Sequence, residues 1–125
     1  MDVRILIEEA SKALSEAYAP YSGFKVGASV LTRGGEVFRG CNVENASFGL
    51  TICAERAAIF AAVGAGHRKI KQVVIVGEGP QQPVPCGACL QVMSEFGVEL
   101  VTVGVSGKDF NTYDLKELLP RPFRL

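Results

Sequence analysis

Residues 70–105 read IKQVVIVGEGPQQPVPCGACLQVMSEFGVELVTVGV, and the order of the elements expected here specifies the fold class. Ile70–Val76 is a nearly continuous β-branched run, which is typical of a strand covered on both faces. Glu78–Pro85 predicts a loop, Cys86–Phe96 predicts a helix, and Val98–Val105 predicts another strand. A strand, a helix and a strand in this order predict a parallel crossover, and hence an α/β fold with a sheet between helical layers.

The elements on either side of this stretch extend the same architecture. Apolar residues recur three and four positions apart from Val3 to Ala17, which predicts a helix that ends near Ala19, because Pro20 disfavours helical geometry in the residue before it. The remaining expectations are strands over Phe24–Leu31 and Glu36–Cys41 joined at Gly34-Gly35, an irregular loop over Asn42–Ile52, a helix over Cys53–Val63, a short strand or loop over Asp109–Tyr113, and a short helix capped by Thr112 or Asp114.

Length and composition bound the function. The chain has 125 residues, of which 48% are hydrophobic and 21% charged, and this predicts one globular domain over residues 1–125. The formal net charge is zero, so no overall field favours nucleic acid or an anionic membrane, and we expect neither as a partner. No run approaches the ~20 apolar residues of a membrane helix, and the first residues lack the pattern of a signal peptide, so we expect a cytoplasmic protein.

Two cysteine motifs carry the chemistry, because closely spaced cysteines in a reducing compartment favour metal binding or catalysis. Cys53 is followed by Ala54-Glu55-Arg56, and Cys86 and Cys89 form a C-x-x-C motif after Pro85. Three thiolates can hold one zinc and leave the fourth tetrahedral position for water, which is the layout of a catalytic site. Glu55 is close enough to that water to act as a general base, and the pattern is the one described for zinc-dependent cytosine and adenine deaminases.

The net charge of this metal set needs an offset. Three thiolates and one Zn²⁺ sum to −1, which weakens the metal as a Lewis acid. The expected helix N-termini at Cys53 and Cys86 provide part of the offset. Arg56 is the candidate for the rest, as a donor to a ligand sulfur.

A structural zinc site with Cys41 as a fourth ligand remains open. Cys41 has no C-x-x-C partner of its own, which favours a small buried apolar residue over a fourth ligand. His67 is the only histidine and lies in a glycine-rich basic turn, which does not favour a catalytic role.

The chain resembles the small homotetrameric, zinc-dependent cytidine deaminases of pyrimidine salvage. The resemblance is carried by Phe24-Lys25-Val26-Gly27-Ala28, Gly40-Cys41-Asn42-Val43-Glu44-Asn45 and the two cysteine motifs. It implies a three-layer α/β/α cytidine-deaminase-like fold with a central mixed sheet of about five strands. It also implies that zinc-bound hydroxide attacks C4 of cytidine or 2′-deoxycytidine, while Glu55 takes the water's proton and passes it to N3. The products would be uridine or 2′-deoxyuridine and ammonia.

The resemblance further implies binding roles and a homotetramer with shared active sites. Asn42 and Glu44 should bind the ribose 3′-hydroxyl, and Phe24 should pack on the pyrimidine. Ala54 is also expected among the substrate-binding residues. The positions expected to reach a neighbouring subunit's site are Ala46, Phe48 and Phe123.

Two positions depart from the family pattern, and three alternatives remain. Phe48 stands where tyrosine is frequent, and Leu90 stands where arginine is common after the second cysteine of the C-x-x-C motif. The alternatives are a deaminase of a cytosine-containing antibiotic, a polynucleotide deaminase, and a zinc-stabilised binding module in which Glu55 has no chemical role.

Overall fold

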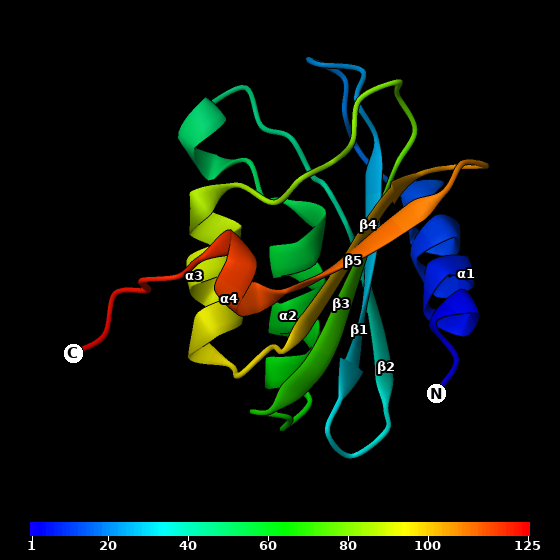
Figure 1. The fold of residues 1–125 in the computed structure, drawn as a ribbon. Coiled ribbons are helices and arrows are strands. Elements are labelled where there is room, and N and C mark those ends of the chain that lie inside the picture. Colours follow the sequence, from blue (N-terminus) through cyan, green and yellow to red (C-terminus); the bar gives the residue numbers. More distant parts are fainter.

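The computed structural model describes residues 1–125 and is built on a five-stranded mixed sheet (Figure 1). The strand order is β2-β1-β3-β4-β5, with β3 and β4 parallel and every other neighbouring pair antiparallel. The strands are β1 Val26–Thr32, β2 Val37–Cys41, β3 Ile70–Gly77, β4 Leu100–Val105 and β5 Phe110–Asp114. The prediction of a mixed sheet of about five strands is confirmed.

Helices cover both faces of this sheet, which confirms the three-layer prediction (Figure 1). The helices are α1 Val3–Leu14, α2 Ala54–Gly64, α3 Gly87–Glu95 and α4 Leu115–Leu118, with a short 3₁₀ helix at Phe48–Leu50. Strand β3 supplies the core on both sides: Val73 and Ile75 pack under α2 and α3, whereas Val74 and Val76 pack under α1. None of these helices has the length and hydrophobicity of a membrane span.

The prediction for the end of the first helix is wrong. Helix α1 ends at Leu14 rather than near Ala19. Tyr18 is already extended, because its N–H donates to Asn42 O (3.0 Å) and its carbonyl accepts from Glu44 N (2.8 Å). Pairing with a distant segment therefore overrides the helical periodicity that continues to Ala17.

The ambiguous C-terminal segment is resolved as strand and helix. Phe110–Asp114 pairs with β4 as the edge strand β5. Asp114 then begins α4 with a capping box, in which its N–H donates to the Glu117 side chain (3.2 Å). Of the two predicted caps, the structure therefore selects Asp114.

One edge of the sheet gathers the segments that carry the cysteine motifs. Val26 at the start of β1 pairs with Gly77 at the end of β3, and Gly27 pairs with Cys41 at the end of β2. The loops that leave β2 and β3 therefore emerge side by side and lead into α2 and α3. This register places the first turns of both helices at the same edge of the sheet (Figure 1).

Gly40 lets α2 approach β2 closely enough for this arrangement. A Cβ atom at Gly40 would lie 2.6 Å from Ala54 O and 2.9 Å from Ala57 C, both in the α2 backbone. Real Cβ atoms do not approach backbone this closely, so any side chain here would push α2 away from the sheet.

We predict that Gly40→Ala lowers the free energy of unfolding by about 3 kcal/mol, because the added methyl group overlaps the backbone of α2. The matched control is Gly64→Ala at the far end of α2, where a Cβ meets nothing within 4 Å. That control should change the free energy by less than about 1 kcal/mol. Urea denaturation of both variants measures the difference, and equal stabilities would contradict the close-packing argument.

Candidate metal centre and active site

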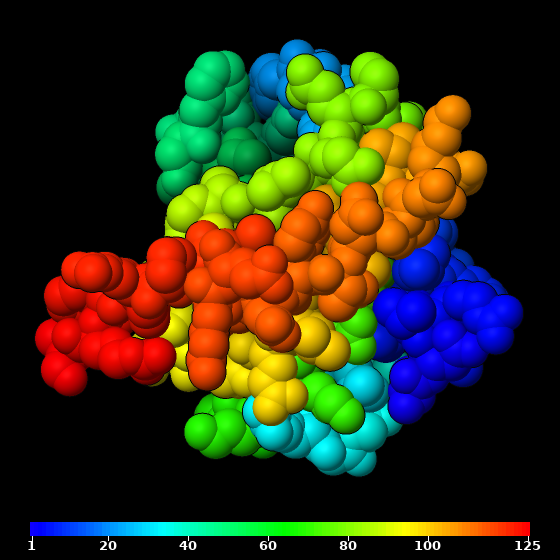
Figure 2. Space-filling view, viewed as in Figure 1, coloured from blue at the N-terminus to red at the C-terminus, as the bar shows by residue number.

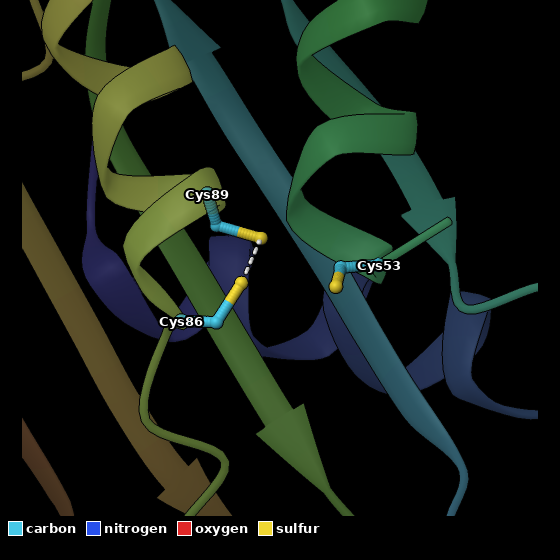
Figure 3. Close-up of side chains that lie close together, drawn as sticks. All are labelled: Cys53, Cys86 and Cys89. Atoms are coloured by element: carbon cyan, nitrogen blue, oxygen red, sulfur yellow. Dashed lines mark hydrogen bonds between the residues drawn. The ribbon is translucent and has the colours of Figure 1, made fainter. Parts of the chain in front are cut away.

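The side chains of Cys53, Cys86 and Cys89 converge on one point (Figure 3). Their sulfur atoms all lie within 4.8 Å of one another, and Cys86 Sγ lies 3.5 Å from Cys89 Sγ. Cys53 is the N-cap residue of α2, Cys86 is the N-cap residue of α3, and Cys89 lies one turn into α3. Two helix N-termini therefore point toward the same three sulfurs.

The donor set fits a zinc ion. Sulfurs bound to one tetrahedral zinc at about 2.3 Å lie about 3.8 Å from one another, which small rotations of these side chains reach from the observed separations. Sulfur is a ligand type that zinc prefers, and three protein ligands leave the fourth position open.

The thiols themselves favour a bound cation. A hydrogen bond from Cys89 is the main cause that lowers the pKa of Cys53 to about 5. Burial acts in the opposite direction, and contact with the Arg56 guanidinium lowers the pKa further. The hydrogen bond with Cys53 is also the main cause that raises the pKa of Cys89, and burial of Cys89 adds to this effect. One thiolate is thus stabilised at the expense of its neighbour, and a divalent cation removes that conflict.

Arg56 contacts this cluster directly. Its Nη2 lies 3.2 Å from Cys53 Sγ, and its Nε is buried without a hydrogen-bond partner. The Cys53 thiolate raises the pKa of Arg56, so the guanidinium stays charged. This contact places a positive charge at the sulfur of an expected zinc ligand. The role of Arg56 in offsetting the negative charge of the thiolates remains a prediction.

Glu55 is buried in the first turn of α2, with 5% of its surface exposed. Burial, with a smaller contribution from the Cys53 thiolate, raises the pKa of Glu55 to about 7 against the opposing hydrogen bond from its own backbone N–H. A carboxyl group with a pKa near 7 can both accept and release a proton at neutral pH.

A pocket of about 210 Å³ opens onto the cluster and brings several predicted residues together. Among the predicted substrate-binding residues, Phe24, Asn42 and Ala54 line this pocket beside Glu55. The full lining is Phe24, Val26, Asn42, Thr51, Ile52, Cys53, Ala54, Glu55, Pro83, Val84 and Cys86.

Glu44 lies in an adjoining hollow rather than in this pocket. That hollow is lined by Tyr21, Ser22, Glu44, Asn45, Phe48 and Thr51, and it shares Thr51 with the first pocket. The hydrogen bond from the Ser22 hydroxyl is the main cause that lowers the pKa of Glu44, and hydrogen bonds from backbone N–H groups of the same loop lower it further. Glu44 is therefore a carboxylate at neutral pH, and it is available as a hydrogen-bond acceptor.

Three predicted residues lie outside the pocket formed by their own chain. Ala46 is exposed, and Phe48 is 76% exposed with its ring edge-on to Tyr21 at 6.3 Å. Phe123 is 70% exposed on the C-terminal segment, which projects from the body of the molecule (Figure 2). Within one chain these residues do not line the pocket, and their contact with a neighbouring subunit's site stays a prediction.

Cys41 and His67 do not belong to the metal cluster. Cys41 is absent from the group of converging sulfurs and lines a separate hollow on the side of α1. His67 pairs with Glu36 at 3.0 Å and packs against Phe38. Their positions argue against a four-cysteine structural site and against a catalytic histidine.

Sequence analysis missed the residues that close the pocket. Pro83 and Val84 come from the loop after β3, and Thr51 and Ile52 come from the segment before Cys53. Neither segment has a hydrophobic period. Their only signal is their position directly before a metal-binding motif, where the chain must pass the site.

The arrangement defines a class of enzyme. Zinc-dependent deaminases place a glutamate that is not a metal ligand beside a cysteine or histidine zinc set, within a pocket that holds one base. This chain has the same arrangement with sulfur at all three protein positions, and so falls within that class of hydrolases.

Comparison with known proteins identifies the family. The family described as "Cytidine and deoxycytidylate deaminase zinc-binding region" matches residues 2–105. A cytidine deaminase of Halalkalibacterium halodurans is 45% identical over 125 residues, covering 98% of this chain and 95% of that protein. The crystal structure of cytidine deaminase from Burkholderia pseudomallei superposes with a TM-score of 0.93 at 47% identity, covering 98% of this chain and 100% of the other.

A further structure agrees: cytidine deaminase from Mycobacterium tuberculosis superposes with a TM-score of 0.85 at 38% identity, covering 100% of this chain and 99% of the other. The chain belongs to the zinc-dependent cytidine deaminase family. The predictions of the family, the fold, an enzyme and a zinc cofactor are thereby confirmed.

We predict that Cys89→Ser abolishes stoichiometric zinc binding, because a neutral hydroxyl replaces a thiolate ligand. Cys41→Ser is the matched control and should retain one zinc per chain. Metal analysis of the purified variants after dialysis distinguishes them. Equal zinc loss in both variants would indicate that Cys41 is a fourth zinc ligand.

Proposed function

We propose that residues 1–125 form one deaminase domain that converts cytidine and 2′-deoxycytidine to the corresponding uridines and ammonia. The observation that carries this proposal is the buried Glu55 beside three converging sulfurs, in a pocket of about 210 Å³. A pocket of this size accommodates a single pyrimidine ring.

Cys53, Cys86 and Cys89 would hold the zinc. When bound, zinc supplies a Lewis acid that lowers the pKa of water and so provides the nucleophile. Arg56 donates to the Cys53 sulfur and offsets the excess negative charge of the thiolates. The N-termini of α2 and α3 add partial positive charge at Cys53 and Cys86.

Glu55 moves the protons of the reaction. It accepts a proton from the attacking water as oxygen adds to C4, and it delivers that proton to N3. It then takes the second proton from the new C4 hydroxyl and passes it to the exocyclic amino group, so that the C4–N4 bond breaks and ammonia leaves. The overall balance is cytidine plus water giving uridine plus ammonia, with Glu55 unchanged.

Phe24 and Asn42 orient the nucleoside. The Phe24 ring packs on the pyrimidine, and Ala54 lies at the pocket wall beside it. Asn42 donates to Phe24 O (2.8 Å) and accepts from Val26 N (2.9 Å), which leaves one amide N–H and one lone pair for the sugar. The free N–H and the free lone pair of the Asn42 amide, together with the Glu44 carboxylate, can bind the 3′-hydroxyl of the sugar.

The proposed assembly is a homotetramer in the cytoplasm, acting in pyrimidine salvage. Its support is the exposure of large apolar side chains near the pocket and on the C-terminal segment: Phe48 (76%), Leu50 (71%) and Phe123 (70%). Exposed apolar groups of this size favour burial against another subunit. Ala46, Phe48 and Phe123 would then complete a neighbouring site.

Glu55→Gln should lower kcat for cytidine at least about a thousandfold, because the amide cannot accept the proton. Zinc content and thermal stability should stay near those of the wild type. The control is Glu8→Gln on α1, an exposed carboxylate whose contact with Lys12 is 3.7 Å long. Loss of cytidine absorbance with parallel ammonia detection measures the rates. A rate near that of the wild type in the zinc-loaded Glu55→Gln variant would contradict the mechanism.

Arg56→Gln should reduce kcat or zinc affinity about 10- to 100-fold, since it removes the cationic donor to a ligand sulfur. Arg39→Gln is the control, because Arg39 is half exposed and its nearest carboxylate contact is 3.8 Å long. The same absorbance assay and a zinc titration provide both quantities. Unchanged rate and unchanged zinc affinity would show that Arg56 has no charge-balancing role.

Shared active sites predict complementation between two inactive variants. Phe48→Ala should damage the neighbouring site, whereas Glu55→Gln damages its own, so mixed assemblies contain some sites with both residues intact. Co-expressed variants should exceed the activity of either parent, and light scattering should give about four times the chain mass of 13.3 kDa. A fully active monomer of wild-type sequence would exclude the shared site.

A further inference from the structure

Ser22 lies at the centre of a hydrogen-bond chain that connects two proposed substrate-binding residues. Its hydroxyl donates to Glu44 Oε2 and accepts from Phe24 N (3.0 Å). The other carboxylate oxygen, Oε1, accepts from the backbone N–H groups of Tyr21 (2.9 Å) and Ser22 (3.1 Å). The Glu44 carboxylate is therefore held at both oxygens by residues 21–22.

The backbone geometry determines the direction of this chain. Gly23 has a φ of +72°, and this turn brings Phe24 N–H onto the Ser22 oxygen. Because that oxygen accepts from Phe24, its own proton is directed at Glu44. Successive hydrogen bonds of this kind strengthen one another.

The backbone of Phe24 is held at its carbonyl as well as at its N–H. Its carbonyl accepts from Asn42 Nδ2 (2.8 Å), while its N–H donates to Ser22. Ser22 thus joins Glu44 to a backbone segment that Asn42 already anchors. Both proposed sugar-binding side chains are thus hydrogen-bonded to the backbone of Phe24, Asn42 directly and Glu44 through Ser22.

We propose that Ser22 is a positioning residue that orients the Glu44 carboxylate for the 3′-hydroxyl of the nucleoside. This inference rests on the proposed function and adds a determinant of sugar recognition to it. Without the Ser22 hydroxyl, Glu44 keeps its backbone contacts at one oxygen but is free to rotate the other. The sugar hydroxyl is bound equally before and during the chemical step, so the loss falls on KM rather than kcat.

The test compares Ser22→Ala and Ser22→Thr on cytidine and 3′-deoxycytidine. Ser22→Ala should raise KM for cytidine about tenfold with kcat within about twofold, because it removes a hydrogen bond to a charged acceptor. KM for 3′-deoxycytidine should not change, and Ser22→Thr should restore the wild-type KM for cytidine. Ser15→Ala is the control, because Ser15 is exposed and its hydroxyl donates only to Lys12 O within its own turn.

A double-mutant cycle with Glu44→Ala separates positioning from a general effect on the fold. If Ser22 acts through Glu44, Ser22→Ala should have no further effect on KM in the Glu44→Ala background. Additive effects, or equal KM increases for both substrates, would overturn the inference. If Ser22→Ala does not fold, Ser22→Cys provides the same comparison with nearly the original volume.

The outcomes also separate this inference from the proposed function. A wild type that deaminates cytidine, with Ser22→Ala showing wild-type KM values on both substrates, overturns the role of Ser22 and leaves the deaminase intact. A zinc-loaded wild type that deaminates neither nucleoside overturns the proposed function and the inference together.

Discussion

Three cysteine sulfurs can bind one zinc ion only if the helices that carry them begin close together. Cys53 and Cys86 each precede a helix, and those helices begin at the same edge of the sheet because β2 and β3 both end there. Close contact of α2 with β2 at Gly40 keeps Cys53 within reach of the other two sulfurs. Fold and metal centre therefore form one unit, in which displacement of α2 would also separate the ligands.

The surroundings of the metal centre divide acid–base properties among neighbouring groups. Burial raises the pKa of Glu55 to about 7, whereas hydrogen bonds from residues 21–22 lower the pKa of Glu44. One carboxyl group is thereby suited to proton transfer and the other to stable hydrogen bonding. The contrast arises from position. Glu55 is buried in the first turn of α2, whereas Glu44 lies in a loop where N–H and hydroxyl groups of residues 21–22 donate to it.

Periodic segments and the cysteine motifs could be predicted from the sequence. The β-branched run of β3 and the spacing of Cys86 and Cys89 report local geometry directly. The end of α1 could not be predicted, because pairing of Tyr18 with residues 42–44 terminates it. The hydrogen bonds between Ser22 and Glu44 depend on a contact across more than twenty positions. The proposed roles of Phe48 and Phe123, both exposed in one chain, depend on a second subunit.

Zinc K-edge X-ray absorption of the purified protein measures whether zinc is held by three sulfurs with one position left for water. We expect three sulfur neighbours at about 2.3 Å and one oxygen or nitrogen neighbour at about 2.0 Å. Four sulfur neighbours, with Cys41 as the added ligand, would contradict a catalytic centre and indicate a structural zinc site.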